Sequence, residues 1–66
     1  MEININGKKE SLPEGLSLLE FLQKKKQELA GVVVEYNEKV IPREQWSAIK
    51  LQDADVLEIL KFMGGG

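Results

Sequence analysis

The 66-residue chain contains neither cysteine nor histidine. These absences exclude disulfides and cysteine thiolate nucleophiles, as well as general acid–base catalysis by histidine. They also remove the two commonest transition-metal ligands, so no metal site is expected. A chain of this length has little room for a substrate pocket. We therefore expect a protein that is not an enzyme on its own.

The sequence also has few features of nucleic-acid-binding, membrane or secreted proteins. The net charge is −2, whereas nucleic-acid binding calls for a basic patch or stripe. The apolar runs span only a few residues, far fewer than the ~20 of a membrane-spanning helix. No charged leader followed by an apolar stretch opens the chain. We expect one domain in the cytoplasm, with no nucleic-acid or membrane partner.

What remains is a series of short strand signals. In MEINING, Ile3 and Ile5 point one way and polar residues the other, as in a half-buried strand. The Asn6-Gly7 pair that follows favours a tight hairpin turn, with KKESL as the returning strand. Further strands are predicted at GVVVEYN (31–37), at 40–41, at IKLQ (49–52) and at VLEILKFM (56–63), with one helical turn over 43–49.

One longer segment, SLLEFLQKKKQ (17–27), is typical of an amphipathic helix. Ser17 and Glu20 have the spacing of a capping box, and Leu18, Phe21 and Leu22 share one face. The helix must cover one face of the sheet to bury that stripe. The last strand is expected to pair with the first. The predicted fold class is therefore α+β, a β-grasp mixed sheet crossed by one main helix, with these residues buried: Ile3, Ile5, Leu18, Leu22, Val34, Leu57 and Ile59.

The chain ends in three glycines, Gly64, Gly65 and Gly66, after a domain formed by residues 1–63. A phosphate-binding loop would need a helix after the glycines, and none follows. A frayed end or a linker scar needs no chemistry. Alternatively, the Gly66 carboxylate is the reactive group, activated as an acyl adenylate. Glycine suits entry into a narrow active site because it has no Cβ, and three extended residues reach ~10 Å.

The last strand gives this third interpretation some support. Its alternation places Leu57 and Ile59 on one face, and Glu58, Leu60 and Phe62 on the other. The helix can cover only one face, so Leu60 and Phe62 are predicted to form an exposed partner-docking patch. The alternative is that they pack under the segment 43–46.

Three segments together resemble the ThiS sulfur carriers of thiamin biosynthesis, within the ubiquitin-like β-grasp group. They are INGKK at the first hairpin, YNEKVIPREQW (36–46), and the aspartate turn that leads through VLEILKFMGGG. The middle segment is the most discriminating, because all carriers of this type share the terminal Gly65-Gly66 pair. One departure is Ala54, where the family usually has glycine between two aspartates. This departure predicts a strained or altered turn.

The resemblance implies a mechanism and a set of partners. A ThiF-type adenylating enzyme would use ATP to activate the Gly66 carboxylate, with Gly64 and Gly65 entering its active site. A persulfide derived from a cysteine desulfurase would supply sulfur, leaving a thiocarboxylate. The thiazole synthase ThiG would then receive the sulfur. The carrier itself would bind no cofactor, and a monomer is expected.

Other interpretations stay open at this point. A MoaD-type carrier for molybdopterin synthesis would share the fold and the chemistry, although those chains resemble this one less. A ubiquitin-like protein modifier would instead form isopeptide bonds through Gly66. The remaining alternative is a small binding domain with an inert tail.

Overall fold

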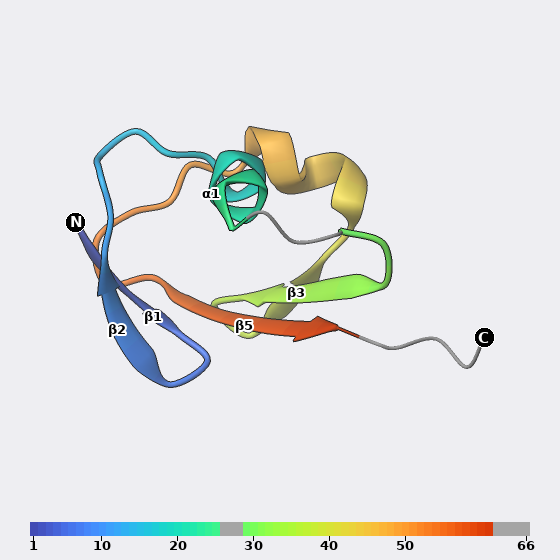
Figure 1. Ribbon diagram of the computed structural model, residues 1–66, viewed down its shortest axis with the longest axis horizontal. Helices are drawn as coiled ribbons and strands as arrows, with labels where there is room; N and C mark the ends of the chain where they lie inside the picture. Colours follow the sequence, from blue (N-terminus) through green and yellow to red (C-terminus); the bar gives the residue numbers. More distant parts are fainter. Residues whose placement is uncertain (26–28, 62–66) are drawn as a thin grey trace.

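The computed structural model describes residues 1–25 and 29–61. Its elements, in chain order, are β1 (Glu2–Ile5), β2 (Lys8–Ser11), α1 (Leu18–Lys24), β3 (Val32–Tyr36), β4 (Lys39–Ile41), the 3-10 helix η1 (Arg43–Ala48) and β5 (Val56–Lys61). The strands form one five-stranded sheet in the order β2-β1-β5-β3-β4. Both helices lie on the same side of this sheet (Figure 1).

The sheet is mixed because one of its four strand pairs is parallel. β1 runs parallel to β5, whereas β1–β2, β3–β4 and β3–β5 are antiparallel pairs. The predicted pairing of the last strand with the first is therefore confirmed. So is the α+β class, because a mixed sheet crossed on one face by a helix is the β-grasp arrangement.

The capping box predicted for α1 is present. The Ser17 hydroxyl accepts a hydrogen bond from the Glu20 amide at 3.1 Å, and the Glu20 carboxylate accepts one from the Ser17 amide at 2.9 Å. The hydrogen bonds from Ser17 hold the pKa of Glu20 below its usual value. The predicted stripe, Leu18, Phe21 and Leu22, is buried against the sheet. The part of the predicted helix at 26–27 lies outside the described residues.

The core lies between the helical layer and the sheet. Its buried members are Ile3, Ile5, Leu16, Leu18, Phe21, Leu22, Val34, Trp46, Leu51 and Leu57. Trp46 comes from η1, which is longer than the single turn predicted, and its indole N–H donates to the Ile41 carbonyl at 3.2 Å. The predicted burial of Ile59 is wrong, because this residue is only half-buried. It lies two positions beyond Leu57, the last residue of β5 paired with β1, so its core-facing side opens into a surface groove.

The strand predicted at 49–52 is also wrong. Lys50 forms only an isolated bridge to Ser17, with flanking hydrogen bonds from Leu18 N to Ile49 O and from Leu51 N to Leu16 O, 2.8 and 2.9 Å long. The segment thus pairs with the chain that enters α1 and not with the sheet. Its apolar pattern reflects the burial of Leu51 in the core.

Candidate functional site

The candidate site is the C-terminal end of β5, from which the glycine tail continues. Four residues predicted to act there lie outside the described residues: Phe62, Gly64, Gly65 and Gly66. The structure describes β5 as far as Lys61. It places β5 at the centre of the sheet, between β1 and β3. The tail is therefore preceded in the sequence by the central strand of the sheet.

The outer face of the sheet, away from the helices, carries exposed apolar residues. Leu60 is 47% exposed, Val56 42% and Val40 63%. Leu60 faces Val33 across the β3–β5 pair. The predicted exposure of Leu60 on the uncovered face is therefore confirmed, whereas its role in docking stays a prediction.

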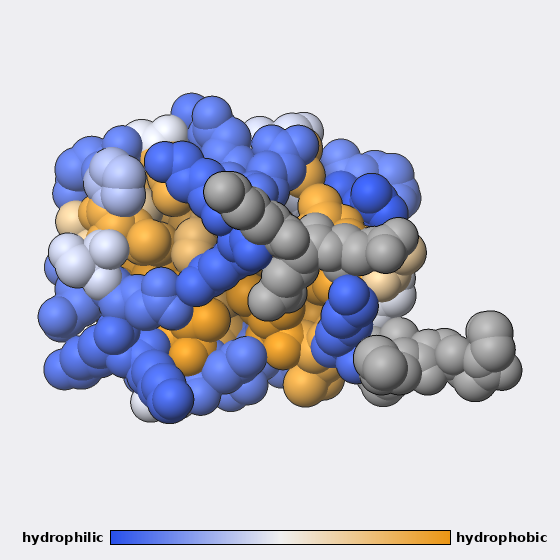
Figure 2. All heavy atoms as spheres, viewed as in Figure 1, coloured by the Kyte–Doolittle hydropathy of each residue, from blue (hydrophilic) through white to orange (hydrophobic). Residues whose placement is uncertain are grey.

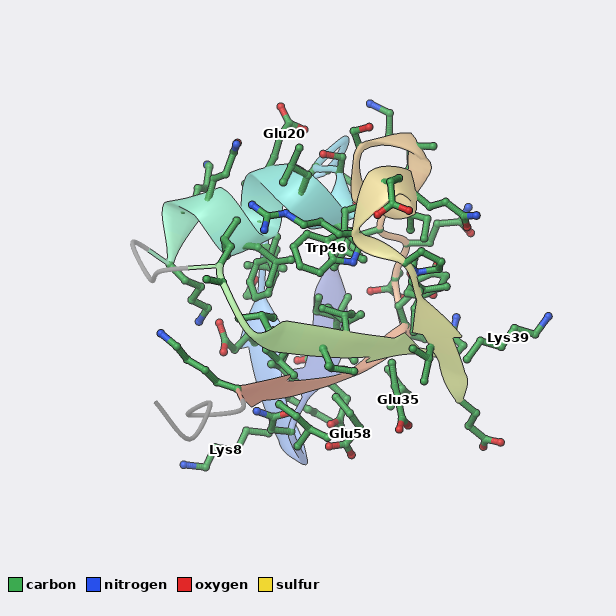
Figure 3. All side chains as sticks on the ribbon, turned by 90° about the vertical axis from the view of Figure 1, so that its right-hand side faces the viewer. Lys8, Glu20, Glu35, Lys39, Trp46 and Glu58 are labelled. Carbon is green, nitrogen blue, oxygen red and sulfur yellow. The ribbon has the colours of Figure 1, made fainter. Side chains whose placement is uncertain are left out.

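Two carboxylates lie among these apolar residues. Glu35 and Glu58 are directly opposite each other across the β3–β5 pair. Both point away from the helical layer, on the opposite side of the sheet from Trp46 (Figure 3). Like charges placed opposite in a sheet are mildly destabilising. No ion pair joins either carboxylate to a cation within residues 1–25 and 29–61. We call Val40, Val56, Leu60, Glu35 and Glu58 the outer patch.

The inner side of the strand end opens into a groove between α1 and the sheet. Apolar atoms are visible between the helical layer and the sheet, framed by hydrophilic side chains (Figure 2). The groove is lined by Ile5, Asn6, Lys8, Glu10, Leu22, Lys25, Ile59 and Lys61. An ion pair of 3.2 Å between Lys25 and Glu10 crosses it. The two sides of the strand end thus differ in charge, with three lysines and one glutamate lining the groove and two glutamates on the outer patch.

The start of β5 is held by a polar cluster around Asp55, which is only 8% exposed. Its carboxylate accepts hydrogen bonds from the Tyr36 hydroxyl at 2.7 Å, the Asn37 side-chain NH2 at 3.2 Å and the Gln52 backbone N–H at 2.7 Å. Burial and the bond to Asp55 raise the pKa of Tyr36 to about 12. This cluster was not anticipated from the sequence, where its only signal is the recurrence of polar residues next to predicted strand ends.

Over residues 1–25 and 29–61, no group of three acidic side chains is arranged to hold a metal ion. In the same part of the chain, no helix is both long and apolar enough to cross a membrane.

The structure is that of a small domain whose central strand precedes the glycines in the sequence, and comparisons with known proteins agree with it. The family model described as the ThiS family matches residues 1–66. The chain belongs to the ThiS family. It is 30% identical over 66 residues to the sulfur carrier protein ThiS of Escherichia coli (strain K12), and the match covers all of both chains.

A solved structure of a ThiS protein has the same fold. The crystal structure of the thiamine biosynthesis protein ThiS from Geobacter metallireducens superposes with a TM-score of 0.85 at 39% sequence identity, covering all of both chains. A third relative is larger. The chain is 29% identical over 66 residues to a thiazole synthase of Paramagnetospirillum magneticum, of which the match covers 20%. A segment similar to this chain thus occurs within a protein named thiazole synthase.

Proposed function

We propose that this ThiS-family chain is a sulfur carrier, and that the Gly66 carboxylate carries the sulfur. The observation that supports this most is the end-to-end match with the Escherichia coli sulfur carrier, which includes the glycine tail. The lack of cysteine agrees with it, because the chain offers no thiol of its own to compete with a terminal thiocarboxylate.

The chemistry proceeds by activation and substitution at one carbon. A carboxylate oxygen of Gly66 attacks the α-phosphorus of ATP and pyrophosphate leaves, giving an acyl adenylate. The terminal sulfur of a cysteine persulfide then attacks the acyl carbon, and AMP leaves. A second thiol breaks the resulting S–S bond, forming a disulfide and releasing the thiocarboxylate. ATP is held by the ThiF-type activating enzyme, so the carrier binds no cofactor.

The sulfur acceptor in this proposal is thiazole synthase. The relative in which a matching segment occupies one-fifth of a protein named thiazole synthase supports this assignment. A carrier segment within the same protein would raise the effective concentration of its sulfur at the acceptor.

The surface proposed to bind the activating enzyme is the outer patch, and Phe62, two residues after Leu60 in the sequence, is proposed to contribute to the same docking. Leu60 and Val56 are apolar, exposed and on the strand that leads to the tail. Large apolar anchors typically dominate protein interfaces. A partner that covers this face would hold the base of the tail while the glycines extend into its active site.

Deletion of Gly66 tests the proposal. We expect loss of ATP–pyrophosphate exchange and of the intact-mass change that corresponds to one oxygen replaced by sulfur, because the carboxylate no longer reaches the reacting position. Gly65→Val should also impair both, since a Cβ and branched side chain restrict the backbone and the channel. Gly64→Ala is the matched control and should be tolerated better, being farther from the reacting carbon.

Three results would count against this function. Normal adenylation and thiolation without Gly66 would show that the tail is not the reactive site. Acyl transfer to lysine without sulfur release would indicate a protein modifier. Transfer of sulfur to a molybdopterin synthase and not to thiazole synthase would favour the MoaD-type role.

A further inference from the structure

The end of β5 extends beyond the end of its neighbour β1, and a side chain binds it where β1 no longer does. Pairing between β1 and β5 stops at Ile5 and Leu57, whereas pairing between β3 and β5 continues to Lys61. The last part of β5 therefore has a neighbouring strand on one side only. On the other side lies Asn6, the first residue of the hairpin turn after β1.

Asn6 continues the ladder with its side-chain amide. Its backbone N–H donates to the Leu57 carbonyl at 2.9 Å, which is the last main-chain bond between the two segments. Beyond it, the Asn6 side-chain oxygen accepts from the Ile59 N–H at 2.7 Å, and the side-chain NH2 donates to the Ile59 carbonyl at 3.2 Å. A carboxamide has the donor and acceptor of a peptide group. It therefore satisfies both main-chain groups of Ile59 that the absent strand would otherwise satisfy.

The turn geometry makes this contact possible. Asn6 has a φ of 52° and Gly7 a φ of 84°, as a two-residue type I′ hairpin requires. The main chain thus turns away from β5 at Asn6, whereas the Asn6 side chain stays beside β5. Asparagine tolerates this left-handed conformation better than most residues, so one residue serves both the turn and the strand end.

We propose that Asn6 is a positioning residue for sulfur transfer: it clamps β5 at Ile59 and so fixes where the C-terminal tail leaves the domain. This inference rests on the proposed function and goes beyond it, since it assigns a role to a residue whose contacts with β5 are to Leu57 and Ile59. Without the clamp, Ile59, Leu60 and Lys61 are held by β3 alone. These residues are then less firmly attached to the domain and in effect lengthen the tail. Leu60 therefore no longer keeps a fixed position relative to the start of the tail.

The kinetic consequence follows from the population of the clamped state. Each net hydrogen bond shifts an equilibrium by a factor of roughly 2 to 12. If only the clamped strand end docks productively, the apparent affinity falls in proportion to the fraction clamped. Saturating carrier restores the bound complex, so the effect belongs in KM and not in kcat.

The chain supplies its own matched control. Asn37 occupies the corresponding position of the second hairpin, with a φ of 49°. Its side chain accepts from the Val56 N–H at 2.9 Å and donates to Asp55 at 3.2 Å. Asn37→Gly therefore removes two similar bonds from the start of β5, and Asn6→Gly removes two from its end. Glycine keeps the positive φ at both positions.

The experiment is ATP–pyrophosphate exchange by the ThiF-type enzyme, measured against carrier concentration. For Asn6→Gly we expect KM to rise by roughly three- to tenfold at unchanged kcat. For Asn37→Gly we expect KM within about twofold of the unsubstituted chain, at a comparable loss of stability. Asn6→Asp, which keeps the acceptor for the Ile59 N–H and loses the donor, should lie between the two.

A second readout needs no partner. Hydrogen exchange of the Ile59 amide should accelerate roughly tenfold in Asn6→Gly and remain unchanged in Asn37→Gly. The proposal is overturned if Ile59 exchange and KM are unchanged in Asn6→Gly, or if Asn37→Gly raises KM equally. In those cases deletion of Gly66 would still abolish activation, so the sulfur-carrier function would stand. Failure of the unsubstituted chain to be activated would remove both proposals.

Discussion

Ala54 sits where the chain needs a glycine, and replacing it should stabilise the protein. The Asp55 N–H donates to the Gln52 carbonyl at 3.1 Å, which closes a four-residue turn with Asp53 and Ala54 at its centre. Ala54 has a φ of 73°, whereas Asp53 is not among the residues with positive φ. A positive φ at the third position alone is the pattern of a type II turn, which favours glycine there. The family's usual glycine at this position has the same physical basis.

The size of the effect follows from two opposing terms. A left-handed conformation costs a residue with a Cβ roughly 1–2 kcal/mol. Glycine relieves that strain but loses about 0.5–1 kcal/mol through the greater freedom of its unfolded chain. Ala54 is exposed, so its methyl group contributes little burial. The hydrogen bond from the Ala54 N–H to the Glu2 carbonyl, at 2.8 Å, is retained in Ala54→Gly. The net gain is about 0.5–1 kcal/mol, or a rise of roughly 3–6 °C in Tm for a domain of this size.

Urea and thermal unfolding of Ala54→Gly measure this gain directly. Ala48→Gly is the control, because Ala48 is also exposed and lies at the end of η1 without a positive φ. There the glycine should destabilise by about 0.5–1 kcal/mol. If both substitutions lower the stability equally, the left-handed conformation of Ala54 carries no strain and this reasoning fails.

Two further predictions concern the polar cluster and the outer patch. Because the folded-state pKa of Tyr36 is raised to about 12, its contribution to stability is complete below the unfolded pKa of about 10 and is lost as pH rises through 12. Tyr36→Phe should lack this pH-dependent loss of stability in alkaline unfolding. A difference in stability between the variant and the unsubstituted protein that stays the same between pH 9 and 12 would contradict the assignment. Leu60→Asp should weaken binding to the activating enzyme by tenfold or more, on the order of one interface anchor, and leave the urea midpoint within experimental error; unfolding of this variant would show that Leu60 is a core residue, whereas unchanged binding would show that the patch is not the docking surface.

The sequence predicted those features that depend on local periodicity. Alternation in MEINING and the spacing of Ser17 and Glu20 specified β1, the first hairpin and the start of α1, because each signal lies within a few residues of the structure that it forms. The exposure of Leu60 followed in the same way, from the period of two in β5 and a single covering helix.

The features that were not predicted depend on where strands end in space. Ile59 fits the inward pattern of β5, but β1 stops short of it, and no local pattern reveals the length of a neighbour. The segment around Leu51 has the composition of a strand because it is buried, although it contacts the helix entry and not the sheet. The contact of Asn6 with Ile59 and that of Asp55 with Tyr36 join residues that are far apart in the sequence. Turn propensity therefore explained the residue types and not their partners.

The central position of β5 explains how a domain with a thin core can still hold the base of its reactive C-terminal tail in place. A 66-residue domain buries only about 60% of its unfolded surface and is marginally stable as a whole. Stability is not uniform, however, and edge strands and termini open first. The tail continues from the central strand, whose start is held by the Asp55 cluster and whose end is held by β3 and Asn6. Opening of β2 or β4 at the edges therefore leaves the base of the tail in place. Loss of the Asn6 contact is the local event that should displace that base without unfolding the domain.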